Sequence, residues 1–232
     1  MQLRKADRRG LADEAADRIR EAIFAGVFPP GSPVREVELA ASLDVSRGSV
    51  REGLAVLERE GLVRSAWHRG TRVIDLTAQD AEEVYSVRAA LEGLASRSAV
   101  GRVDLDALGE LVDAMSRRLA ASAPSDELLA LDVEFHDTVY QAAGNRRLLE
   151  AWHAVRSQVY LFQLTRIRLG YHGYRAVVVD EHRELVRLLE VGDPEAVTTF
   201  AEEHVRSALR VLVGQLGQPD HSGHSGQPGR LG

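Results

Sequence analysis

Residues 36–63, EVELAASLDVSRGSVREGLAVLEREGLV, decide the fold of this chain. Apolar residues recur at steps of three and four on both sides of the central DVS, which predicts two amphipathic helices joined by a tight turn. Ser46 can accept a hydrogen bond from a backbone N–H of the second helix, and Gly61 is expected to end that helix. The stretch therefore predicts a helix-turn-helix.

Two arginines lie at the start of the second predicted helix. Arg47 and Arg51 are one turn apart, so their side chains project together. Guanidinium groups in the first turns of a recognition helix can reach guanine edges or phosphate oxygens in the major groove. The alternative is that they are solvated charges paired with neighbours such as Glu52 or Asp44.

A two-stranded wing is predicted after this helix. Val63–Ser65 and Thr71–Ile74 have the pattern of short strands around a turn that carries His68 and Arg69, and Arg72 adds a further positive charge. Such a wing would lie along the phosphates or in a minor groove and add affinity that does not depend on base sequence.

These segments together resemble the winged helix of GntR-type bacterial transcription regulators over about residues 11–74. The matching motifs are Phe28-Pro29-Pro30-Gly31, Glu38-Leu39-Ala40, Val45-Ser46-Arg47, Val50-Arg51-Glu52 and Arg69-Gly70-Thr71. The chain departs from the family pattern at Gly48, Ser49 and Gly53, where members often carry Thr-Pro and Ala. The resemblance implies that DNA is contacted by Arg35, Ser46, Arg47, Ser49, Arg51, His68, Arg69, Gly70 and Thr71.

Composition favours a globular protein of two domains. The chain has 232 residues, 44% of them hydrophobic, and no cysteine, so a disulfide framework is excluded and a reducing cytoplasm is expected. No apolar run is long enough to span a membrane. Residues 1–74 contain 13 basic and 11 acidic residues and the remainder contains 16 and 24, so the overall charge of −6 comes from the second part.

From about residue 78 onward the periodicity is helical throughout. Breaks at glycine-containing or polar segments divide it into about six helices, near 78–100, 104–121, 125–143, 145–169, 175–191 and 193–214. The fold class is thus mainly α. We expect a winged helix-turn-helix domain over 1–74, a linker over 75–79, an all-helical domain over 80–216 and a disordered tail over 217–232.

Four polar residues fall on the apolar stripes of three predicted helices. Asp132 and His136 are one turn apart, and His182 and His204 lie on later helices. Burying three imidazoles and a carboxylate is costly unless they are satisfied, and one divalent cation such as zinc, nickel or manganese would satisfy all four. The alternative is that each histidine is a core residue hydrogen-bonded to a carbonyl oxygen or to Glu181 or Glu203.

The second half resembles the FCD ligand-binding domain of the FadR subfamily. The motifs are Asp132-x-x-Phe135-His136, Glu181-His182-Arg183 and Glu203-His204. In many FCD domains the Asp and three His at these positions hold a metal, and a carboxylate effector completes its coordination. Arg88 matches an arginine that often meets the effector, although it could equally pair with Glu92 four residues on.

The favoured hypothesis is a DNA-binding regulator, expected to be a repressor, whose affinity for a pseudo-palindromic operator is set by a small organic acid. One winged helix buries too little surface for strong specificity, so a homodimer is expected, with the helical domain forming the interface. One alternative is a metal-dependent enzyme on a helical bundle. A third is a DNA-binding scaffold without an effector.

Overall fold

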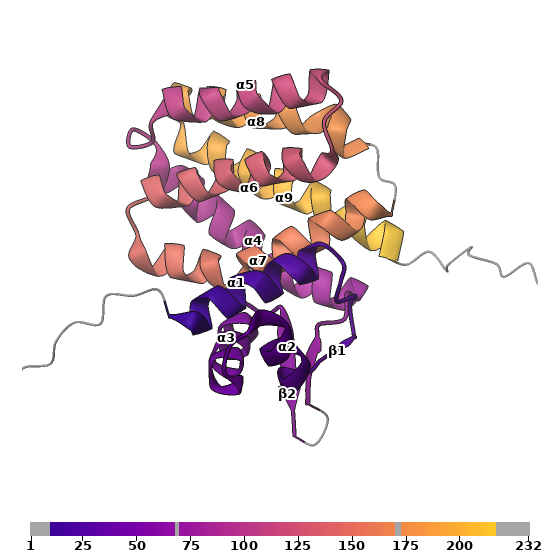
Figure 1. The fold of residues 1–232 in the computed structure, drawn as a ribbon. Helices are drawn as coiled ribbons and strands as arrows, with labels where there is room; N and C mark the ends of the chain where they lie inside the picture. Colours follow the sequence, from indigo (N-terminus) through magenta and orange to yellow (C-terminus); the bar gives the residue numbers. More distant parts are fainter. Residues whose placement is uncertain (1–9, 68–69, 170–172, 217–232) are drawn as a thin grey trace, which may run out of the picture.

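The computed structural model describes residues 10–67, 70–169 and 173–216, which form nine helices and three strands (Figure 1). The N-terminal elements are α1 (Leu11–Phe24), β1 (Pro33–Val34), α2 (Glu36–Leu43), α3 (Arg47–Arg59), β2 (Val63–Ala66) and β3 (Gly70–Val73). The C-terminal elements are α4 (Ala78–Ala99), α5 (Leu105–Ala120), α6 (Ser125–Ala142), α7 (Arg146–Arg168), α8 (Gly173–Val191) and α9 (Pro194–Leu216). The prediction of a mainly helical chain with an N-terminal winged helix-turn-helix is confirmed.

The helix-turn-helix is fixed by the local signals expected for it. The Ser46 hydroxyl accepts a hydrogen bond from the backbone N–H of Ser49 at 3.1 Å and caps α3. Gly61 follows the end of α3 with φ +67°, a backbone conformation that glycine adopts without strain. A Cβ at Gly61 would also collide with the Gln158 side chain of α7.

The wing contains one strand more than expected. The three strands pair antiparallel in the order β1-β3-β2, and Pro33 and Val34 lie opposite Arg72 and Thr71. The sequence prediction missed β1 because a two-residue strand that begins with proline has no detectable alternation. The two predicted wing strands are present.

Helix α3 crosses α1 closely at Gly53. A Cβ at Gly53 would lie 2.8 Å from the Ala12 carbonyl oxygen and 3.0 Å from the Ala16 nitrogen, so only glycine allows this approach. Buried side chains fill the rest of this interface, including Ile19 and Leu57. The departure from the family pattern at Gly53 therefore has a packing reason.

The six C-terminal helices form one bundle, with α5 far from the winged helix and α7 beside it (Figure 1). Its core contains large side chains that are fully buried, namely Leu108, Met115, Phe135, Tyr140 and Trp152. None of the helices in the described ranges has both the length and the apolar character that crossing a bilayer requires. The predicted disorder of 217–232 concerns residues outside the described ranges.

Helix α4 begins at Ala78, so the last two residues of the predicted linker belong to its first turn. Thr77 caps α4, and its hydroxyl accepts from the backbone N–H of Asp80 at 3.1 Å. The two parts of the chain also touch directly. Leu161 of α7 is 2% exposed and belongs to the core formed by α1, α2, α3 and the wing.

Candidate functional site

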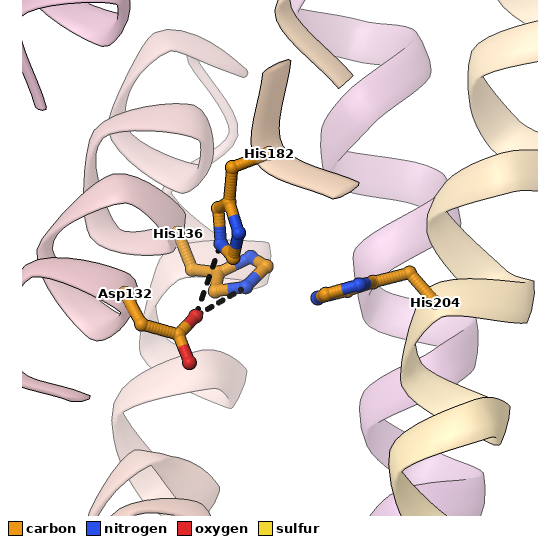
Figure 2. A group of neighbouring side chains, drawn as sticks. All are labelled: Asp132, His136, His182 and His204. Atoms are coloured by element: carbon orange, nitrogen blue, oxygen red, sulfur yellow. Dashed lines mark ion pairs between the residues drawn. The ribbon is translucent and has the colours of Figure 1, made fainter. Parts of the chain in front are cut away.

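The four predicted metal ligands meet inside the C-terminal bundle. Asp132 and His136 come from consecutive turns of α6, His182 comes from α8 and His204 from α9 (Figure 2). One potential ligand atom from each side chain lies within 4.8 Å of the others. The helical spacing placed the first two side chains together, and the fold adds two residues that are remote in sequence.

Three of these ligand atoms are buried without a hydrogen bond of normal geometry among the described residues, namely Asp132 Oδ1, His136 Nε2 and His182 Nε2. Oδ1 lies only 3.2 Å from His136 Nε2 and 3.0 Å from His182 Nε2. Buried polar atoms normally have partners, because leaving them unsatisfied costs free energy. A shared cation would satisfy them together, so the residues fit a divalent metal with nitrogen and oxygen ligands.

In each of the three histidines the second ring nitrogen, Nδ1, lies beside an oxygen atom from outside the cluster. His136 Nδ1 lies 2.7 Å from a Glu92 oxygen, and His204 Nδ1 lies 2.9 Å from a Glu181 oxygen. His182 Nδ1 lies 2.6 Å from the Val178 carbonyl oxygen.

The carboxylate is held in the same way, since the Tyr174 hydroxyl donates to Asp132 Oδ2 at 3.1 Å. Outer partners of this kind fix the tautomer and the orientation of metal-binding side chains. The alternative reading, in which each histidine bonds to a carbonyl or carboxylate oxygen, therefore describes the Nδ1 atoms. The Nε2 atoms are left available to bind a cation.

The electrostatic balance of the cluster keeps its carboxylates ionised. Burial would raise the pKa of Asp132, but the close imidazoles of His136 and His182 outweigh this effect, and the pKa lies well below its ordinary value. Burial would also raise the pKa of Glu92, but the charge of His136 and its hydrogen bond outweigh this effect and lower the pKa to about 2. Burial lowers the pKa of His204, which favours the neutral imidazole that a metal needs.

A small cavity of about 30 Å³ lies beside the cluster, with room for one or two water-sized molecules. Its walls include Asp132, His182 and His204, together with Gln163 and Arg166 from α7. The Arg166 side chain is buried, and its guanidinium carbon lies 5.2 Å from the centre of the Tyr174 ring. Neither α7 residue was among the predicted site residues.

Arg88, the predicted effector contact, is not among the residues that form this cavity. It is 2% exposed, with its guanidinium 5.7 Å from the Tyr85 ring and 5.8 Å from the Trp152 ring. Its Nε lies 3.8 Å from Glu92 Oε2, so the pairing four residues apart is the one present in this structure. Arg88 is thus linked to the cluster through the carboxylate that orients His136.

The predicted DNA-reading arginines are exposed on α3. The side chains of Arg47 and Arg51 are 62% and 65% exposed, and both face Glu36 of α2. Arg51 Nη2 lies 3.0 Å from Glu36 Oε2 and Arg47 Nη2 lies 3.8 Å from it. The expected alternative partners Glu52 and Asp44 are not the ones found, because the turn brings Glu36 opposite the start of α3.

Most of the remaining predicted DNA contacts lie within the described residues. Arg35 precedes α2 and pairs with Glu38 at 2.8 Å, and the Ser49 and Ser46 hydroxyl oxygens lie 2.9 Å apart. Gly70 and Thr71 begin β3, whereas His68 and Arg69 lie outside the described residues. Nearby, Arg72 donates to the Gly31 carbonyl oxygen at 2.6 Å and so braces the wing.

Comparison with known proteins identifies both halves of the chain. Residues 11–73 match the bacterial regulatory proteins of the gntR family, and residues 83–207 match the FCD domain. The chain belongs to the GntR family of bacterial transcription regulators.

This GntR regulator is 33% identical to a probable D-xylose utilization operon transcriptional repressor of Paenarthrobacter nicotinovorans, over 94% of the chain and 95% of that protein. It is 28% identical to the gluconate operon transcriptional repressor of Bacillus licheniformis, over 77% of the chain and 75% of that protein. A solved GntR regulator from Rhodococcus sp. RHA1 has a TM-score of 0.73 and 26% identity, covering 88% of this chain and 97% of that one.

These relationships make the protein a DNA-binding transcription regulator. The alternative of a metal-dependent enzyme is set aside, because the family and the curated relatives are regulators of transcription. The His and Asp cluster lies within the residues that match the FCD domain.

Proposed function

We propose that this GntR regulator is a metal-dependent sensor of a small organic acid, and that binding of the acid changes its affinity for an operator. The observation that carries the proposal is the convergence of Asp132, His136, His182 and His204 on one point, each braced by an outer partner. The three imidazoles and the carboxylate would hold a zinc, nickel or manganese ion. When bound, the ion supplies a Lewis-acidic centre for a ligand carboxylate.

The chain's own residues provide the rest of the proposed effector site. The cavity beside the cluster carries the guanidinium of Arg166, a suitable partner for a carboxylate. Arg88 would become a second contact if it exchanged the Glu92 carboxylate for the effector. The relatives named as gluconate and D-xylose operon repressors support repression of a gene set for using a carbon source. Of these two compounds, gluconate has the negative charge that the site favours.

On DNA, we propose that Arg47 and Arg51 enter the major groove from the start of α3, together with Ser46 and Ser49. The wing, with His68, Arg69, Gly70 and Thr71, and Arg35 before α2 would contact the backbone or the minor groove. Two copies joined through their C-terminal helices would read a pseudo-palindromic operator. By linkage, operator DNA must change effector affinity by the same factor as the effector changes operator affinity.

Metal analysis tests the part of the proposal on which sensing depends. Purified protein equilibrated with Ni²⁺ and then desalted should retain about one ion per chain by elemental analysis. The double variant His182→Ala/His204→Ala should retain none, while His153→Ala, which changes an exposed histidine on α7, should retain as much as the wild type. Equal retention by the double variant and the wild type would refute the site.

A further inference from the structure

Helix α7 has two faces with different neighbours. Gln163 and Arg166 lie on one face and line the cavity beside the metal-ligand cluster. Ser157 and Leu161 lie on another face and contact the winged helix. All four side chains are buried, so a shift of α7 would displace the residues packed against both faces.

The cavity face of α7 contains an unsatisfied polar group. Gln163 is 4% exposed, and its Oε1 has no hydrogen-bond partner among the described residues. Its side-chain amide lies in the same cavity wall as Arg166, which is 5% exposed. A buried amide beside a buried guanidinium is an arrangement suited to an anionic ligand that also carries hydroxyl groups.

The charge around the cavity points to the same kind of ligand. Arg88 and Arg166 are buried cations; the Glu92 carboxylate lies beside Arg88, and Asp132 lines the same cavity as Arg166. A divalent cation would add two positive charges, of which the partly buried Glu181 offsets one. Buried charge is stable only when it is compensated, so the loaded site favours an anionic ligand.

The opposite face of α7 is joined to the winged helix by several contacts. The Ser157 hydroxyl donates to Glu60 Oε2 at 2.8 Å, and Glu60 also accepts two hydrogen bonds from Arg20 of α1. The Arg168 guanidinium donates to the Phe24 carbonyl oxygen at the end of α1. Glu60 directly follows α3, so these contacts reach the helix that carries the DNA-reading arginines.

We propose that α7 binds the effector and transmits its binding to the winged helix. Gln163 and Arg166 bind the acidic end of the ligand. The contacts of Ser157, Leu161 and Arg168 transmit the resulting shift of α7 to the winged helix. This inference rests on the proposed function and adds the residues and the route by which the site acts. Because the cavity is only about 30 Å³, an acid of several carbon atoms fits only if its walls move.

Ligand binding to the Ni²⁺-loaded protein tests the cavity face. Calorimetry should detect binding of at least one of the probes L-lactate, D-gluconate and citrate, and D-glucose, the neutral counterpart of gluconate, should not bind. Arg166→Gln and, separately, Gln163→Met should weaken binding of that acid at least tenfold while Ni²⁺ stoichiometry stays at the wild-type value. Arg147→Gln, an exposed change on the same helix, should bind as the wild type does.

The outcomes distinguish failure of the proposed function from failure of the assignment of Gln163 and Arg166. Failure of the wild type to retain Ni²⁺ overturns the proposed function itself. Retention of Ni²⁺ with no acid bound overturns the sensing of an acid together with the assignment of Gln163 and Arg166. Retention of Ni²⁺ with undiminished acid binding in both cavity variants overturns only that assignment.

Hydrogen exchange tests the second face. Adding the acid should change amide exchange in residues 11–24 and 47–60 of the wild type. In Ser157→Ala/Arg168→Ala this change should fall by at least half, while acid affinity stays within twofold of the wild type. An unaltered exchange response in the double variant, or none in the wild type, would overturn the route through α7.

Discussion

The Ser157 hydroxyl of α7 donates a 2.8 Å hydrogen bond to the Glu60 carboxylate, across 97 residues of sequence. Glu60 directly follows the helix that carries Arg47 and Arg51, and Ser157 shares its helix with Arg166 of the cavity wall. This hydrogen bond thus connects the winged helix with the C-terminal bundle.

Glu60→Gln should lower the free energy of unfolding by about 1–3 kcal/mol. The carboxylate is partly buried, and Arg20 donates to it through Nε at 2.8 Å and Nη2 at 2.6 Å, so its neutralisation removes one of the two carboxylates that pair with this guanidinium and leaves Asp17 as the other. Urea denaturation measures the change. Glu52→Gln, an exposed change on α3, is the control and should leave stability unaltered. Equal stability of both variants would show that the contact contributes little.

Arg47→Ala and Arg51→Ala should each weaken binding to an operator selected from random DNA by about tenfold or more, since each removes a guanidinium from the start of α3. Arg59→Ala changes an arginine at the other end of the same helix and should have a much smaller effect. Gel-shift titration at fixed salt measures all three. If the Arg59 variant loses as much affinity as the other two, α3 does not read DNA through its first turns.

Glu36→Gln should raise affinity for non-specific DNA by about two- to fivefold. The hydrogen bonds from Arg51 lower the pKa of Glu36, so it is a carboxylate at neutral pH and holds Arg51 in the absence of DNA. Its removal frees both arginines and deletes a negative charge near the phosphates. Fluorescence anisotropy with a random duplex gives the change, and a decrease in affinity would contradict this role.

The metal-free protein should become less stable as pH rises from about 6.5 to 9. Burial would lower the pKa of His136, but the carboxylates of Glu92 and Asp132 outweigh it and raise the pKa from 6.5 to about 9. Because this pKa is higher in the folded state than in the unfolded state, protonated His136 contributes its full stabilisation below pH 6.5. That contribution to the free energy of unfolding is lost as the pH rises to about 9.

Thermal unfolding with a chelator across this pH range should show the fall in melting temperature. With Glu92→Gln, the fall attributable to His136 should shrink, because the variant lacks the neighbouring charge. A melting temperature that rises over the same range in the wild type would count against a protonated His136.

Much of the fold could be predicted from the sequence, because its signals are local. Ser46 and Gly61 bound α3 through the hydrogen bond and backbone angle expected of them, and glycine breaks separate several helices of the bundle. Strand β1 was missed because its pairing with Arg72 and Thr71 is a tertiary contact and leaves no periodic pattern in two residues.

The candidate site could be predicted only in part. Periodicity placed Asp132 and His136 on one face, but joining them to His182 and His204 depended on resemblance to a family. The positions of Glu92 and Arg166 beside the cluster could not be predicted, since helical periodicity shows which face is buried without showing which helices meet there. A buried glutamate and a buried arginine on otherwise apolar faces were the only available signals.

Effector sensing as proposed depends on Asp132, His136, His182 and His204 holding one divalent cation together. A crystal of the Ni²⁺-loaded protein, measured on both sides of the nickel absorption edge, locates the ion without reference to activity. We expect one anomalous-difference peak per chain, enclosed by the three Nε2 atoms and the Asp132 carboxylate. A peak elsewhere, or no peak in crystals of protein that retains nickel, would contradict it.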